Sequence, residues 1–163
     1  MPFSVTSHSP DDTCKLANTL APLLQGGDVL LLHGVVGAGK TDLARKIIQN
    51  RMAAHGGLED VPSPTFTLVQ AYDLGGLEYV HADLYRLSHP DEVYELGLEH
   101  AFEHAVCLIE WPDRLASFTP QNALDIHISI QGEWARNFKF SWTQPAWSDR
   151  LAELKPLNSS DGQ

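Results

Sequence analysis

A chain of 163 residues is long enough for one domain, and a content of 43% hydrophobic and 20% charged residues is that of a globular protein. Its net charge of -10, from 21 acidic and 11 basic side chains, argues against unaided binding to RNA, DNA or an anionic membrane surface. No apolar run approaches the roughly 20 residues of a membrane-spanning helix, and two cysteines without a signal peptide indicate a reducing cytoplasm.

The predicted elements begin with an amphipathic helix over residues 12–24, which Gly26 and Gly27 end. The continuous apolar run over residues 29–33 predicts a strand that is buried on both faces. A glycine-rich turn follows this strand, and residues 40–52 predict a second helix. The first third of the chain therefore has the order strand, turn, helix that is typical of α/β proteins.

The middle of the chain predicts a hairpin, a helix and another strand. Residues 67–72 and 77–82 are rich in β-forming side chains and are separated by a short glycine-containing turn, which predicts the hairpin. Residues 91–98 predict a short helix. Residues 105–109 predict a second buried strand, which ends on the acid Glu110.

The last part of the chain predicts a second hairpin. Apolar and polar side chains alternate over residues 124–130 and 136–142, which predicts two half-exposed strands with a turn at Gly132. There is no internal repeat. We expect residues 1–155 to form one domain and the end of the chain, residues 156–163, to be a disordered tail.

A glycine-rich motif lies between the first predicted strand and the second predicted helix. Residues 34–41 are Gly-Val-Val-Gly-Ala-Gly-Lys-Thr and match the phosphate-loop pattern G-x-x-x-x-G-K-[ST]. The glycines let successive backbone N–H groups point at phosphates, and the helix N-terminus adds partial positive charge. The predicted nucleotide-binding residues are Gly34, Val36, Gly37, Ala38, Gly39, Lys40, Thr41 and Asp42. The alternative is a strand, turn and helix whose glycines serve only the turn.

The end of this motif carries its charged and hydroxyl groups. Lys40 would reach the β and γ phosphates of a nucleotide, and the Thr41 hydroxyl would hold Mg²⁺. Asp42 lies in the first turn of the helix, where its charge favours the helix dipole but opposes an anionic nucleotide.

Hydrolysis also needs an acid near the metal and a group that orients the attacking water. Glu110 follows a buried strand, and the carboxyl ends of strands are where open α/β sheets place functional side chains. Asp83 ends another predicted strand and could face the same crevice. The alternative for both is a strand-end acid that faces solvent.

Two further features carry weaker signals. His81 shares a strand face with Asp83, but without a set of cysteine ligands we interpret it as structural. The other seven of the eight histidines have no recognisable metal-binding spacing. Residues 63–67 are Ser-Pro-Thr-Phe-Thr, so Thr65 lies either in a switch loop that senses the γ-phosphate or in a rigid turn.

Four blocks of sequence occur in a characteristic order. They are Gly-Asp-Val-Leu-Leu-Leu-His-Gly before Gly-Ala-Gly-Lys-Thr, then Ser-Pro-Thr-Phe-Thr-Leu-Val, His-Ala-Asp-Leu-Tyr-Arg-Leu and Leu-Ile-Glu-Trp-Pro. Their order and spacing, from about residue 12 to residue 140, resemble the TsaE (YjeE) family. The resemblance implies an α/β, three-layer P-loop NTPase-like fold with a mixed central β-sheet and helices on both faces.

The resemblance also implies a function. It is that of the ATPase subunit of the bacterial machinery that makes N6-threonylcarbamoyladenosine at position 37 of tRNAs reading ANN codons. The partners would be TsaB and TsaD, TsaD would transfer the carbamoyl group to tRNA, and the ATPase would reset the complex between turnovers. ATP and Mg²⁺ would be the cofactors, and tRNA would be contacted mainly through the partners.

Residue roles follow from the same resemblance. Lys40 and Thr41 would hold phosphates and Mg²⁺, Glu110 would be the second acid at the metal, and Asp83 would support hydrolysis. The other positions implied are Thr65 in the switch-like loop, Trp111 beside the nucleotide and Arg136 as a late arginine near it.

The chain differs from the family pattern at two positions. Family members commonly have an acid after the first phosphate-loop glycine and a second Ser or Thr after Lys-Thr, where this chain has Val35 and Asp42. Two other functions stay open from the residues alone. One is a small-molecule kinase, although the arginines are scattered and form no lid cluster; the other is a nucleotide-dependent docking module without significant hydrolysis.

Overall fold

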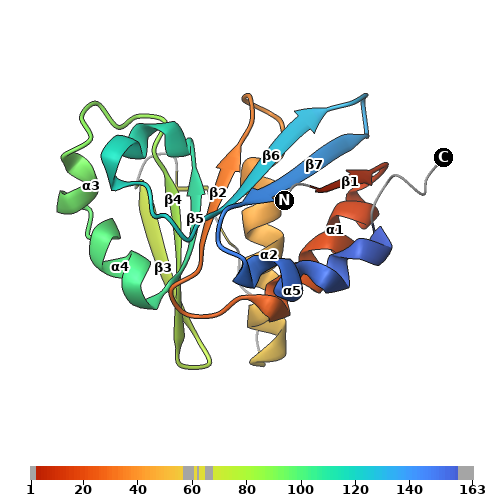
Figure 1. Cartoon of the computed structure of the whole chain (residues 1–163), viewed down its shortest axis with the longest axis horizontal. Coiled ribbons are helices and arrows are strands. Elements are labelled where there is room, and N and C mark those ends of the chain that lie inside the picture. The colour runs from red at the N-terminus through yellow and green to blue at the C-terminus, as the bar shows by residue number, and fades with distance from the viewer. Residues whose placement is uncertain (1–2, 57–60, 62, 65–67, 158–163) are drawn as a thin grey trace.

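A seven-stranded mixed sheet forms the centre of the computed structural model, which describes residues 3–56, 61, 63–64 and 68–157 (Figure 1). The strand order is β1-β7-β6-β2-β5-β4-β3. Strands β2, β5, β4 and β6 form the parallel pairs β2·β5, β2·β6 and β4·β5, and the other three pairs are antiparallel. The strands are β1 (Phe3–Ser7), β2 (Val29–His33), β3 (Val69–Leu74), β4 (Leu77–Asp83), β5 (Val106–Glu110), β6 (Leu124–Ile130) and β7 (Arg136–Trp142).

The apolar composition of β2 and β5 explains why these two strands lie in the middle of the sheet. The first four residues of β2 and all five of β5 are buried, and almost all of these side chains are apolar. A strand that is apolar on both faces is stable only where both faces are covered, which is the middle of an α/β sheet. The phosphate-loop motif therefore follows a strand that is held in the middle of the sheet.

Helices cover both faces of the sheet (Figure 1). The alternate residues Leu30 and Leu32 of β2 pack on the face of α1 (Pro10–Leu20), α2 (Lys40–Ala54) and α5 (Ala146–Arg150). On the opposite face, Val29 and Leu31 pack with residues of α3 (Glu92–Glu95) and α4 (Leu98–His104). The remaining helical segments of the described chain are the 3-10 turns η1 (Ala21–Leu23), η2 (Pro112–Phe118) and η3 (Leu151–Leu157). The predicted α/β class, with a mixed sheet and helices on both faces, is confirmed.

No helix in the described residues is a candidate for crossing a membrane. None of the helices there has both the length and the apolar character that crossing a bilayer requires.

Most of the predicted elements are present, with shifts of a few residues at their ends. The strand predicted over residues 29–33 is β2, and the helix predicted over residues 40–52 is α2. The two hairpins are β3–β4 and β6–β7. Residue 67 and residues 158–163 lie outside the described residues, whereas η3 continues to Leu157.

Three elements differ from the prediction. The helix predicted over residues 91–98 is wrong in its extent, because Gly97 has a φ of 78° and separates α3 from α4. The edge strand β1 and the helix α5 were not predicted. β1 is fixed by its antiparallel pairing with β7, in which Val5 lies opposite Phe138, and a pairing partner is not visible in a five-residue pattern.

An ion pair between Arg150, which is partly exposed, and the buried Asp28 attaches α5 to the start of β2. Arg150 Nη1 donates to Asp28 Oδ1 at 3.0 Å, Nη2 also bonds Asp28 Oδ2, and Nη2 donates to the Leu23 carbonyl at 2.6 Å. Asp28 Oδ2 accepts a further bond from the Gln25 backbone N–H at 2.6 Å. The guanidinium lies 4.3 Å from the centre of the Trp147 ring. This pair joins the C-terminal helix to the strand that precedes the phosphate loop.

Replacing Arg150 with methionine removes the main partner of the buried Asp28 carboxylate. Because an unpaired buried charge is expensive, we expect Arg150→Met to lower the free energy of unfolding by about 3 kcal/mol. The double variant Asp28→Asn/Arg150→Met, which removes the charge as well, should recover part of that loss. Urea denaturation measures both. A single variant within about 0.5 kcal/mol of the parent would show that the pair does not stabilise the fold.

Candidate active site

Three parallel strands end side by side at the candidate site. β2 passes into the phosphate loop at Gly34, β5 ends at Glu110 and β4 ends at Asp83. In the parallel register Leu32 lies opposite Glu110, and Glu110 lies opposite Asp83. The sheet therefore brings the two predicted acids to one edge, next to the loop, where open α/β sheets have their binding crevice.

The phosphate loop depends on its glycines at two points. Gly34 has a φ of 156°, and a Cβ there would lie 2.8 Å from the carbonyl oxygen of Ile128, closer than real Cβ atoms approach backbone. Gly39, with a φ of 116°, is the N-cap residue of α2 in the left-handed region. Val35 and Val36 between them are exposed. The loop backbone, rather than its side chains, is therefore turned toward the helix N-terminus.

Lys40 is buried at the first position of α2 and is only 5% exposed. Its ammonium donates to the carbonyl oxygens of Gly34, at 2.5 Å, and Val35, at 2.9 Å. It also lies 4.2 Å from the centre of the Trp111 ring. Burial lowers the pKa of Lys40, and the charges of the two site carboxylates act in the opposite direction. The lysine is thus held in place by the loop's own backbone and by an aromatic face.

A chain of hydrogen bonds links Thr41, Glu110 and His81. Thr41 Oγ1 donates to Glu110 Oε1 at 2.7 Å, and His81 Nε2 lies 2.6 Å from Glu110 Oε2. Glu110 is 2% exposed and His81 is fully buried. Among the described residues, His81 Nδ1 has no hydrogen-bond partner. Both oxygens of the Glu110 carboxylate are therefore fixed, one from α2 and one from β4.

Asp83 lines the same cavity as this chain of bonds. It is 6% exposed, and its Oδ1 accepts a hydrogen bond from the Tyr85 backbone N–H at 3.0 Å. The cavity has a volume of about 480 Å³, and its functional lining residues are Lys40, Thr41, Asp42, Asp83, Glu110 and Trp111. Arg45 and Tyr85 also line it, so three carboxylates, one ammonium, one guanidinium and two hydroxyl groups surround a single space.

A second cavity adjoins the first across the loop. It has a volume of about 280 Å³ and shares Gly37, Gly39 and Asp42 with the first cavity. Arg136 lines it and donates from Nε to the Ala38 carbonyl at 3.0 Å, which ties the β6–β7 hairpin to the loop. Its other walls come from the start of α1 and from the hairpin: Ser9, Pro10, Thr13, Glu133, Trp134 and Phe138.

The carboxylate of Asp42 has a partner on its own helix. Lys46 Nζ donates to Asp42 Oδ1 at 2.7 Å, in the i, i+4 spacing that favours such pairs. The sequence suggested that Asp42 would oppose an anion at the helix N-terminus. The pair with Lys46 reduces that opposition, because the local charge of the two side chains sums to zero.

The predicted site residues divide into four groups. Those lining the first cavity are Val36, Gly37, Gly39, Lys40, Thr41, Asp42, Asp83, Glu110 and Trp111, and those at the second include Ala38 and Arg136. Gly34 lines neither cavity but accepts the hydrogen bond from Lys40. Thr65 lies outside the described residues. Sequence reasoning missed the contact of His81 with Glu110, and it missed Thr13 and Trp134.

The donors at Thr41 and Glu110 fit a magnesium ion. A hydroxyl and a carboxylate are the hard oxygen ligands that Mg²⁺ prefers, and the described site contains no cysteine. Their two oxygens lie 2.7 Å apart, close to the separation of about 2.9 Å between neighbouring ligands in an octahedron with Mg–O bonds of 2.0–2.1 Å. These two residues could therefore hold the ion with little rearrangement.

The buried β2, the glycine loop and the helix after it, with acids at the ends of the neighbouring strands, define an α/β protein of the P-loop-like class. The family sequence model described as "Threonylcarbamoyl adenosine biosynthesis protein TsaE" matches residues 7–138. The chain belongs to the TsaE family, and the predicted resemblance is confirmed.

Individual relatives agree with this assignment. The chain is 36% identical over 126 residues to a Rickettsia felis protein named tRNA threonylcarbamoyladenosine biosynthesis protein TsaE, covering 77% of this chain and 72% of that protein. It is 36% identical over 134 residues to the Bacillus subtilis protein of the same name, covering 82% and 81%. The crystal structure of YdiB from Bacillus subtilis superposes with a TM-score of 0.78 at 28% identity, covering 96% of this chain and 95% of that one.

The contact between His81 and Glu110 predicts a role for the histidine in orienting the metal-side acid. His81→Leu leaves Glu110 Oε2 without this partner, and loss of such a supporting bond typically weakens metal binding by about 10- to 100-fold. We expect a loss of this size in the affinity for Mn²⁺ with ADP present. Mn²⁺ takes the place of Mg²⁺ because electron paramagnetic resonance can measure its binding. His81→Gln, which can still donate a hydrogen bond, should recover part of the affinity. Unchanged Mn²⁺ affinity in a folded His81→Leu variant would mean that the contact is only structural.

Proposed function

We propose that this protein is the Mg²⁺-dependent ATPase subunit of tRNA threonylcarbamoyladenosine biosynthesis, acting in the cytoplasm with TsaB and TsaD partners. The observation that carries the ATPase part is the hydrogen-bonded chain Thr41–Glu110–His81 beside Lys40 and Asp83. A loop that only bound phosphate would not need two buried carboxylates in the same cavity, because buried acids are costly unless they bind a cation or take part in chemistry. The family and the names of the relatives support the pathway.

The loop and Lys40 bind the phosphates in this proposal. Backbone N–H groups at the N-terminus of α2 face the anion, and the helix dipole adds partial positive charge. Lys40 exchanges its bonds to the loop carbonyls for bonds to phosphate oxygens. The Trp111 ring, against which the ammonium packs, restricts where that charge can move.

Thr41 and Glu110 would hold the magnesium ion, which would offset the negative charge of the phosphates. His81 keeps the Glu110 carboxylate in the orientation that leaves Oε1 directed at Thr41. The bond between His81 and Glu110 is buried, so water does not compete with it.

Asp83 is the group that orients the attacking water. Its carboxylate lies in the cavity with Lys40 and Glu110, and the bond from the Tyr85 N–H fixes one of its oxygens. An ionised carboxylate in this position can accept a hydrogen bond from the water and direct its lone pair at the γ-phosphorus.

The nucleotide base is assigned to the second cavity. That cavity continues from Gly37 and Gly39 away from the carboxylates, so a nucleotide with its terminal phosphate at Lys40 extends toward Trp134. Trp134 is 65% exposed and offers a ring face for stacking, while Thr13 offers a hydroxyl.

Trp134→Ala therefore separates recognition of the base from recognition of the phosphates. Because stacking of a base on an aromatic ring contributes about 1–3 kcal/mol, we expect ADP affinity to fall by about 5- to 100-fold. Inorganic tripolyphosphate, which has no base, should bind as before. Calorimetry with both ligands provides the comparison, and Ile130→Ala on the same hairpin is the control. Equal losses for ADP and tripolyphosphate would place the base elsewhere.

The overall charge suits a subunit that leaves tRNA to its partners. A net charge of -10 repels a polyanion, and this repulsion is greatest at low salt. The proposal therefore assigns tRNA contact to TsaB and TsaD, as in the expectation from the family resemblance.

Phosphate release with and without the two partners is the experiment that decides among the candidate functions. Hydrolysis that is weak alone and increases when TsaB and TsaD are both added is expected. Transfer of phosphate to a metabolite would instead identify a kinase. Nucleotide-dependent association with the partners without phosphate release would identify a docking module.

Substitution of Lys40 should change nucleotide affinity, whereas substitution of Asp83 should change the rate of hydrolysis. Lys40→Ala removes charge-assisted bonds to the phosphates, so nucleotide affinity is expected to fall by about 10- to 100-fold. Asp83→Ala should bind nucleotide normally, yet its rate of hydrolysis with partners should fall by about 100-fold or more. Asp83→Asn, the variant closest in shape, should show the same split. Retained hydrolysis in either Asp83 variant would remove this residue from the mechanism.

A further inference from the structure

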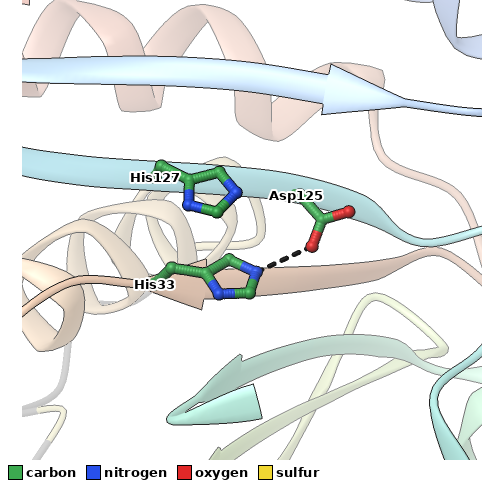
Figure 2. A group of neighbouring side chains, drawn as sticks. All are labelled: His33, Asp125 and His127. Carbon is green, nitrogen blue, oxygen red and sulfur yellow. Dashed lines mark hydrogen bonds and ion pairs between the residues drawn. The ribbon is translucent and has the colours of Figure 1, made fainter. Parts of the chain in front are cut away.

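Three side chains from two strands that are far apart in the sequence meet on the sheet outside the nucleotide site. His33 is the last residue of β2, and Asp125 and His127 lie two residues apart on the neighbouring strand β6. In the parallel register His33 lies opposite His127 and Leu31 lies opposite Asp125, so all three side chains point to the same face (Figure 2). None of them lines either cavity of the nucleotide site.

The cluster has the composition of a metal site. One ligand atom from each residue, an imidazole nitrogen from each histidine and a carboxylate oxygen, lies within 4.8 Å of the other two. Within the described part of the chain this is the one group of three or more His, Cys, Asp or Glu side chains that meets this condition. Two imidazoles with one carboxylate suit Zn²⁺ and similar divalent transition metals, whereas Mg²⁺ and Ca²⁺ prefer oxygen ligands alone.

We propose that His33, Asp125 and His127 form a binding site for a divalent transition metal of the zinc class, with a fourth position open to water or to a ligand from outside the chain. Three protein ligands and one open position are the arrangement of exchangeable zinc sites. The site is separate from the proposed magnesium site and does not depend on the ATPase assignment.

The side chains need a small rearrangement to surround a metal. His33 Nε2 and Asp125 Oδ1 are hydrogen-bonded at 2.7 Å, and tetrahedral ligands with bonds of about 2.0–2.1 Å lie roughly 3.3 Å apart. The two histidine rings are stacked, with centroids 4.1 Å apart and an angle of 11° between their planes. A metal would replace the hydrogen bond and turn the rings toward one point. His33 and Asp125 are 29% and 34% exposed and His127 is exposed, so these rotations do not disturb the core.

The charged groups at the cluster have opposite effects on the binding of a cation. Asp125 supplies a carboxylate that attracts a cation, and Lys139 on β7, which lies opposite His127, repels one. Burial and the neighbouring His33 lower the pKa of His127, with Lys139 acting in the same direction and Asp125 against it.

The test uses the full chain without an affinity tag, treated with a chelator and then titrated with Co²⁺ and Zn²⁺. Visible absorption should show one Co²⁺ in a low-coordinate site with nitrogen ligands, and calorimetry should show one equivalent of Zn²⁺ displacing it. His127→Ala and Asp125→Asn should each weaken binding by about tenfold or more, since even loss of a supporting residue costs that much. Lys139→Met should strengthen binding, because it removes the repelling charge.

His104→Ala is the matched control, since His104 at the end of α4 forms a similar exposed pair with Glu78 of β4 at 2.9 Å. It should bind Co²⁺ as the parent does, and unfolding midpoints check that all variants are folded. The proposal is overturned if the parent gives no low-coordinate Co²⁺ spectrum, or if the His127 and Asp125 variants keep the parent's spectrum and affinity. It is also overturned if His104→Ala loses the metal.

Discussion

The parallel register of β2, β5 and β4 is the constraint on which the rest of the structure depends. Because β2 and β5 are buried on both faces, their side chains can reach a ligand only at the strand ends. The register places Glu110 between the end of β2 and Asp83. A shift of one residue would turn Glu110 to the other face of the sheet and break its bonds to Thr41 and His81. The strand register that packs the core therefore also positions the residues of the site.

Charge is distributed in the site so that it is incomplete without a cation. Glu110 and Asp83 are buried beside a single ammonium, that of Lys40, whose own burial lowers its pKa. The cavity is lined by three acids, Asp42, Asp83 and Glu110, against the two bases Lys40 and Arg45, so its lining carries a net negative charge. In the proposed function, a divalent ion beside these carboxylates would offset their charge and so favour binding of a polyphosphate to an acidic chain.

The sequence was informative where a local pattern is sufficient. The apolar run of β2, the glycine loop and the acid at the end of β5 each follow from a few consecutive residues, and the family resemblance was recognisable from four short blocks. Contacts between strands were not predictable, because register depends on residues far apart in the chain. The bond of His81 to Glu110 spans 29 positions and that of His33 to Asp125 spans 92, and neither histidine has a neighbour in sequence that indicates its partner.

The hydrogen bonds from Lys40 to the Gly34 and Val35 carbonyls have a consequence for how long a nucleotide stays bound. The loop backbone and a phosphate compete for the same ammonium protons. The net affinity for a phosphate is therefore the difference between the bonds of Lys40 to the phosphate and its bonds to the two carbonyls. When a phosphate leaves, the ammonium of Lys40 can bond to these carbonyls again. Such an internal competitor favours fast exchange over tight retention. Fast exchange suits the proposed function, a subunit that passes repeatedly through a cycle of hydrolysis, since a phosphate loop that held its product firmly would stop that cycle after one turn.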